Sequence, residues 1–238
     1  MSQDKSRSNL SIAKSEIKWF FKNHEVTKED SLNLELDLNF QETFPLITKL
    51  VKKASITEFE MEKEKYRLYG WNTSKNNSCG WLCKLENYQS DLNLLFEHRL
   101  LTNTIGGIKE VWDEFDEIEK TDDFTLNQNF LFIQSMCSKG IGFNKDSYLS
   151  LCNKQDKKPL NNFDELIKFS QEANGNMTLY DSVNGEVYLH ARNHYFDYVI
   201  NIESQPEYTF YKIIGVKTFK DFVEKIAENW LSIIDGRG

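Results

Sequence analysis

Long hydrophobic runs are absent from this sequence of 238 residues. No stretch approaches the roughly 20 consecutive apolar residues that a transmembrane helix needs. Residues 1–10 are polar, whereas a secretory signal carries an apolar segment near its start. These absences disfavour membrane-spanning and secreted proteins, so we expect a cytoplasmic protein that has no membrane partner.

Cysteine is scarce as well. The four cysteines (Cys79, Cys83, Cys137 and Cys152) are too few for a disulfide framework, and they suit the reduced thiols of a cytosolic protein. Cys79 and Cys83 could begin a zinc site, but the sequence offers no second pair of ligands with matching spacing. We therefore expect packed thiols here, with no bound metal and no other cofactor.

Proline is equally rare, with three residues in the chain. No stretch has the composition of a linker, and neither a repeat of solenoid period nor a low-complexity tract occurs. The sequence therefore predicts one domain over residues 11–234, preceded by a disordered N-terminus at residues 1–10.

Aromatic side chains, in contrast, are plentiful. The 17 Phe, 10 Tyr and 5 Trp make up 13% of the residues, and 39% of all residues are hydrophobic, which argues for a folded core rather than disorder. The net charge is −8. Because a surface that follows phosphates needs clustered Lys and Arg, this charge disfavours nucleic acid as a partner. An acidic chain instead suits a basic protein partner.

Local patterns in the first half predict both helices and strands. Four leucines alternate with polar residues over positions 32–38, which predicts a strand with one wet face. Residues 43–54 read as a helix with Pro45 in its first turn, where a missing N–H costs nothing. Apolar patterns also predict a helix over residues 11–23, strands over 56–61 and 66–71, and a loop over 72–78.

The second half has clearer signals. Ser90 suggests the N-cap of a helix that ends at Gly106-Gly107. Asn184-Gly185 separates two alternating runs and predicts a hairpin. Thr218 opens an amphipathic helix, with Asp221 placed for a capping box. Strands in series, including those expected over residues 198–202 and 208–214, and a final helix predict an α+β fold with a mixed, largely antiparallel sheet flanked by helices.

An acidic run at residues 109–123 holds eight acidic residues and two lysines, a net charge of −6 out of −8. Such a run is either a solvated surface or a patch that selects a basic partner, and both readings stay open. Trp112 and Phe115 lie among the acids, and buried aromatics anchor many interfaces. The residues that we expect to bind a partner are Trp112, Asp113, Glu114, Asp116, Glu117 and Glu119.

His190 and His194 are the pair most like an enzyme's, with Asp181 and Asp197 near in sequence. If both histidines reached one cleft they could transfer protons, and the chain would be a small hydrolase or a metal-dependent enzyme. The alternative is a histidine at a strand end and a loop histidine that bonds the backbone. Because no nucleophile or third ligand accompanies the pair, we expect no catalytic residue. Gly140-Ile141-Gly142 lacks the lysine of a phosphate loop and reads as a turn.

Several motifs follow one another along the second half of the chain. They are Gly106-Gly107 after an amphipathic helix, Ile167-Lys168-Phe169, Ala173-Asn174-Gly175-Asn176, Leu179, Asn184-Gly185-Glu186-Val187-Tyr188 and Thr218-Phe219-Lys220-Asp221-Phe222-Val223. In this order they resemble the motifs of the SUKH superfamily, which includes fungal regulators of cell-wall assembly and bacterial immunity proteins. The resemblance covers about residues 90–234, without the Leu-Pro that usually precedes the double glycine, and residues 1–89 have no clear counterpart.

This resemblance implies a mixed sheet flanked by helices that has no catalytic centre and binds a protein, commonly a cognate toxin and often a nuclease. Nuclease toxins tend to be basic, which agrees with the acidic run at residues 109–123. We therefore expect an immunity protein that neutralises a toxin. A regulatory scaffold of similar fold is a further alternative, and the family offers no invariant binding residues because its partners differ.

Overall fold

The computed structural model describes residues 8–74, 77–87, 90–113, 128–192 and 197–236. These residues form one sheet of twelve strands. Its strands follow the order β1-β2-β3-β4-β5-β6-β8-β9-β10-β12-β11, and β7 pairs with β8 beside this path. The α+β prediction is confirmed, although the strand pairs in these residues are all antiparallel rather than mixed. The strands are β1 (Val26–Leu32), β2 (Ser55–Met61), β3 (Glu64–Asn72), β4 (Ser78–Leu85), β5 (Gly107–Asp113), β6 (Gln128–Leu131), β7 (Ser138–Lys139), β8 (Ile167–Glu172), β9 (Met177–Tyr180), β10 (Val187–His190), β11 (Val199–Asn201) and β12 (Phe210–Ile213).

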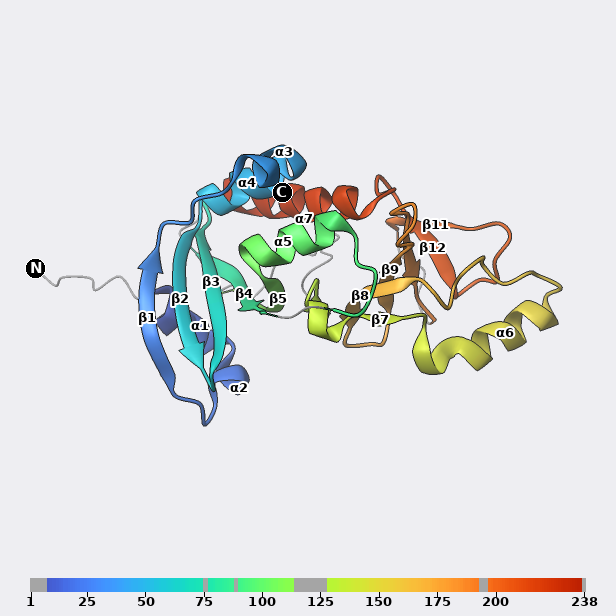
Figure 1. Ribbon diagram of the computed structural model, residues 1–238, viewed down its shortest axis with the longest axis horizontal. Helices are drawn as coiled ribbons and strands as arrows, with labels where there is room; N and C mark the ends of the chain where they lie inside the picture. Colours follow the sequence, from blue (N-terminus) through green and yellow to red (C-terminus); the bar gives the residue numbers. More distant parts are fainter. Residues whose placement is uncertain (1–7, 75–76, 88–89, 114–127, 193–196, 237–238) are drawn as a thin grey trace, which may run out of the picture.

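Helices flank this sheet, and Figure 1 shows α3, α4 and α7 packed along one long side of the molecule. Helix α6 lies at the end opposite β1 in the same view. No helix within the described ranges is long and apolar enough to cross a membrane. The helices are α1 (Asn9–Glu16), α2 (Lys18–Phe21), α3 (Leu38–Thr43), α4 (Pro45–Lys52), α5 (Phe96–Ile105), α6 (Lys145–Lys154) and α7 (Phe219–Asp235), with short 3-10 turns at Gln134–Met136 and Gly142–Asn144.

Strands β3 and β4 are buried on both faces, whereas β1 at the edge of the sheet is largely exposed. In β3, Tyr66 and Leu68 belong to a core under α1 and α2, whereas Tyr69 and Trp71 belong to the main core under α4, α5 and α7. Successive side chains of a strand point to opposite faces, so β3 must be apolar on both. A third cluster forms where Tyr148 of α6 packs against the second half of the sheet.

Helix α7 begins as its sequence predicts. Thr218 Oγ1 accepts a hydrogen bond from the Asp221 N–H, and the Asp221 carboxylate accepts one from the Thr218 N–H, so the capping box is confirmed. Trp230 packs its ring 5.4 Å from that of Trp71 and 5.3 Å from that of Trp81, measured between ring centroids. The helix therefore seals the main core with a cluster of three tryptophans.

Helix α4 takes its N-terminal cap from α7. Pro45 occupies its first turn as predicted, but Phe44 provides no side-chain cap. Instead, the carboxylate of Glu224 accepts hydrogen bonds from the Leu46 N–H at 2.9 Å and the Ile47 N–H at 3.3 Å. A carboxylate at this position satisfies free N–H groups and complements the helix dipole.

The hairpin predicted around Asn184-Gly185 is confirmed. Strands β9 and β10 pair antiparallel, with Val187 opposite Tyr180. Gly185 has φ of +75°, a left-handed conformation that glycine adopts without strain. The Asn184 side chain accepts a hydrogen bond from the Glu186 N–H at 2.8 Å and so closes the turn.

The strand expected over residues 32–38 is wrong. Strand β1 ends at Leu32, and α3 begins at Leu38 because the Asp37 side chain accepts a hydrogen bond from the Phe40 N–H at 2.8 Å. Leu36 is 8% exposed whereas Leu38 is 69% exposed, so the alternating leucines do not share one buried face. The N-capping preference of Asp37 outweighs the alternating pattern.

Two element ends also differ from their predictions. Ser90 does not cap α5, because this helix begins at Phe96 and has Leu95 as its N-cap. The Ser90 hydroxyl instead accepts a hydrogen bond from the Leu92 N–H. At the N-terminus, Ser8 caps α1 and Leu10 is buried, so the predicted disorder is wrong for residues 8–10. Residues 1–7 lie outside the described ranges.

Candidate partner-binding site

The acidic run leaves the sheet between two neighbouring strands. The first five residues of the run lie on β5, which ends at Asp113. The next strand, β6, starts at Gln128 and pairs with β5 through Leu131 and Ile108. Residues 114–127, which join them, lie outside the described ranges. Four of the predicted binding residues fall there, together with Phe115: Glu114, Asp116, Glu117 and Glu119. The acidic run therefore begins on a strand of the sheet, and most of it lies beyond the part of the chain that the structure describes.

Trp112 is not on the surface. It is 1% exposed and belongs to the core under α1 and α2, with Leu68 and Leu82. Its indole lies against Gly80, where a β-carbon would come within 2.4 Å of the ring. The prediction that Trp112 anchors a partner is therefore corrected: this tryptophan anchors β5 in the fold. The sequence did not predict this role, because the charged residues on either side of Trp112 are typical of a solvent-exposed segment.

Carboxyl groups of β5 are partly buried. Asp113 lies opposite Cys79 on β4, and Glu110 lies opposite Leu82. Burial raises the pKa of Glu110 to about 7, although the nearby Lys109 acts in the opposite direction. Glu110 therefore gains or loses a proton near neutral pH, whereas an ordinary exposed glutamate is fully ionised there.

Two glycines shape the turn that leads into β5. Gly106 ends α5, as predicted, with φ of +88°, and a β-carbon there would lie 2.7 Å from the carbonyl oxygen of Lys84. A β-carbon on Gly107 would come within 2.7 Å of Ile133. Glycine adopts the positive φ of Gly106 without strain, and at both positions it leaves room for the neighbouring atoms because it has no β-carbon. The double glycine therefore sets where β5 begins.

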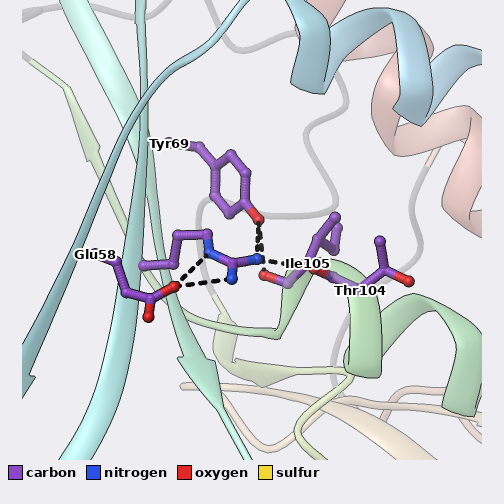
Figure 2. A network of polar contacts seen from close by, with 5 residues as sticks. Glu58, Tyr69, Thr104 and Ile105 are labelled. Atoms are coloured by element: carbon purple, nitrogen blue, oxygen red, sulfur yellow. Dashed lines mark hydrogen bonds and ion pairs between the residues drawn. The ribbon is translucent and has the colours of Figure 1, made fainter. Parts of the chain in front are cut away.

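A buried guanidinium holds the end of α5 against the sheet (Figure 2). Arg67 is 9% exposed, and its Nη1 donates to the carbonyl oxygen of Thr104 at 2.8 Å and to the hydroxyl of Tyr69 at 3.2 Å. Its Nη2 donates to Glu58 Oε2 at 2.9 Å. The Tyr69 hydroxyl in turn donates to the carbonyl oxygen of Ile105 at 3.1 Å.

This network has a structural role. The last carbonyl groups of a helix lack intrahelical donors, and a cation at that end complements the helix dipole. Burial opposes the charge of Arg67, but its contacts with Tyr69 and Glu58 outweigh that effect and raise its pKa. No local pattern predicts this contact, because Thr104 and Ile105 lie 37 and 36 residues along the chain from their partners Arg67 and Tyr69.

His190 is buried rather than placed in a cleft. It is 1% exposed, its ring lies 5.1 Å from that of Phe210, and its Nδ1 has no hydrogen-bond partner among the described residues. Burial, with a further contribution from Arg192, lowers the pKa of His190 to about 4. His194 lies outside the described residues. The position of His190 therefore contradicts its predicted alternative role as an accessible acid or base.

His98 is a second buried histidine, which the sequence analysis missed. Its Nε2 lies 2.8 Å from the carbonyl oxygen of Phe132, and its Nδ1 lies 3.0 Å from the hydroxyl of Tyr180. Because a carbonyl only accepts, Nε2 carries the proton and Nδ1 accepts from Tyr180. Burial lowers the pKa of His98 to about 4, so the ring stays neutral and joins α5 to the sheet.

The cysteines are free thiols with little reactivity. Cys79 and Cys83 are buried in the main core, and burial raises the pKa of Cys79 to about 12, with a smaller contribution from Asp113. Burial likewise raises the pKa of Cys137 to about 12. A thiolate is the reactive and metal-binding form, so these groups are poor nucleophiles and ligands. The described part of the chain contains no group of three His, Cys, Asp or Glu side chains that could hold a metal ion.

A cavity of about 130 Å³ with a mixed polar and apolar lining lies at the end of the sheet near β11, between Lys157 and residues 201–207. Lys157 Nζ donates to the carbonyl oxygens of Glu203 at 2.9 Å and Gln205 at 2.7 Å. The amide of Gln205 donates to the carbonyl oxygen of Lys158 and accepts from the hydroxyl of Tyr148. These bonds fix the chain after α6 to the turn before β12.

Comparison of the chain with protein-family models, with curated proteins and with solved structures found no match in any of the three.

Proposed function

We propose that this chain is a non-catalytic protein-binding domain of the immunity type, which holds a basic toxin inactive. The observation that carries the proposal is the concentration of negative charge in one short segment. A net charge of −6 lies within residues 109–123, which begin on β5. Charge concentrated in so short a segment can meet a basic surface.

Electrostatics explain why such a partner would be favoured. Complementary charge steers two proteins together and can raise the association rate by ten- to a thousandfold at low salt. The rest of the chain carries a net charge of only −2. A basic protein would therefore approach the acidic run in preference to other surfaces.

The surroundings of β5 fix the strand on which the acidic run begins. Trp112 fixes the strand from the core, Gly106 and Gly107 set its start, and the Arg67 network holds the helix before it. A binding segment that starts from a rigid stem loses less conformational entropy when it binds.

The two buried histidines and three of the cysteines favour binding over catalysis. His98 and His190 are buried with lowered pKa values, and Cys79, Cys83 and Cys137 have raised ones. A proton-transfer group needs access to substrate and a pKa near the working pH, which neither histidine has. The alternative of a hydrolase that uses His190 and His194 loses one of its two residues. A regulatory scaffold that binds a basic protein remains compatible with the same surface.

A basic toxin encoded by a neighbouring gene is the partner to test. Purified toxin and this protein should associate quickly at low salt and more slowly as salt screens their charges, because the Debye length falls to about 10 Å at 0.1 M. Replacing Asp113, Glu114, Asp116 and Glu117 by lysine should lower the association rate at low salt about tenfold or more and flatten its dependence on salt.

A matched control keeps the change in net charge equal. It replaces four exposed carboxylates from other parts of the surface by lysine: Glu25, Glu29, Glu35 and Glu42. Stopped-flow association rates should fall much further for the first variant than for the control. Equal rates for both would mean that the acidic run is a solvated surface. Growth protection by this protein against the co-expressed toxin tests the immunity role itself.

A further inference from the structure

No further inference is drawn: the strongest candidate, the cavity of about 130 Å³ between Lys157 and residues 201–207, carries nothing, because Lys157 and Gln205 already bond neighbouring carbonyl groups and nothing in the described residues shows what it would hold.

Discussion

Replacing Trp112 by alanine distinguishes a residue that anchors the fold from one that anchors a partner. The indole is 1% exposed, so the substitution empties a site in the core under α1 and α2. A buried tryptophan covers about 200 Å² of apolar surface, which at about 25 cal/mol per Å² corresponds to about 5 kcal/mol. Trp112 Nε1 is buried and has no acceptor within the described ranges, and removing such a donor returns about 1–2 kcal/mol.

The expected loss for Trp112→Ala is therefore about 3–4 kcal/mol in the free energy of unfolding. Trp112→Phe keeps an aromatic ring and also removes the unpaired N–H, so it should cost only about 1 kcal/mol. Trp19 is the matched control, because it is 61% exposed. Trp19→Ala should change stability by no more than about 0.5 kcal/mol.

Urea denaturation followed by far-UV circular dichroism measures all three variants without relying on tryptophan fluorescence. With a slope of about 3 kcal/mol per M, Trp112→Ala should lower the unfolding midpoint by about 1 M. If its midpoint matched that of Trp19→Ala, the assignment of Trp112 to the core would be refuted. A folded Trp112→Ala protein that had lost its partner would instead support the anchor role that the sequence suggested.

Three further substitutions test other parts of the argument. Trp230→Ala should cost about 3–5 kcal/mol in chemical denaturation and shift the emission of the remaining tryptophans to the red; an unchanged midpoint would mean that its ring faces solvent. Because folding raises the pKa of Glu110 to about 7, wild-type stability should fall as pH rises from about 4.5 to 7. In Glu110→Gln the free energy of unfolding should fall by about 1–2 kcal/mol less over this pH range, after allowance for solvent screening. If the variant and the wild type showed the same dependence of stability on pH, the burial of this carboxyl would be contradicted. Arg67→Met should lower the free energy of unfolding by about 3–5 kcal/mol, because Glu58 and the end of α5 lose the cation that they bind. Lys63→Met, at an exposed position, is the control. If Arg67→Met lowered the melting temperature no more than this control, the role of the network would be disproved.

Patterns that act over a few residues predicted the fold well. The capping box of Thr218 and Asp221, the turn at Asn184-Gly185 and the proline at the start of α4 depend on local backbone preferences. Such preferences determine structure unless packing overrides them. They were sufficient to predict the final helix, the hairpin and the α+β class.

Long-range contacts could not be predicted in this way. The leucines of residues 32–38 alternate as a strand would, yet Asp37 caps a helix and Leu36 fits the main core. Trp112 is surrounded in sequence by charges, and only the pairing of β5 with β4 shows that it is buried. His98 binds groups from Phe132 and Tyr180, which are brought to it by folding. Each outcome depends on residues distant in sequence.

The cap that Glu224 supplies to α4 has a consequence for biosynthesis. The two groups are 178 residues apart, so the ribosome finishes α4 long before the carboxylate that completes its first turn has been made. Until residues 219–235 emerge, Trp71 and Trp81 also lack the ring that covers them. Closing so long a loop is slow, and an uncovered apolar sheet is prone to aggregation. The nascent chain should therefore depend on chaperones until α7 has emerged from the ribosome.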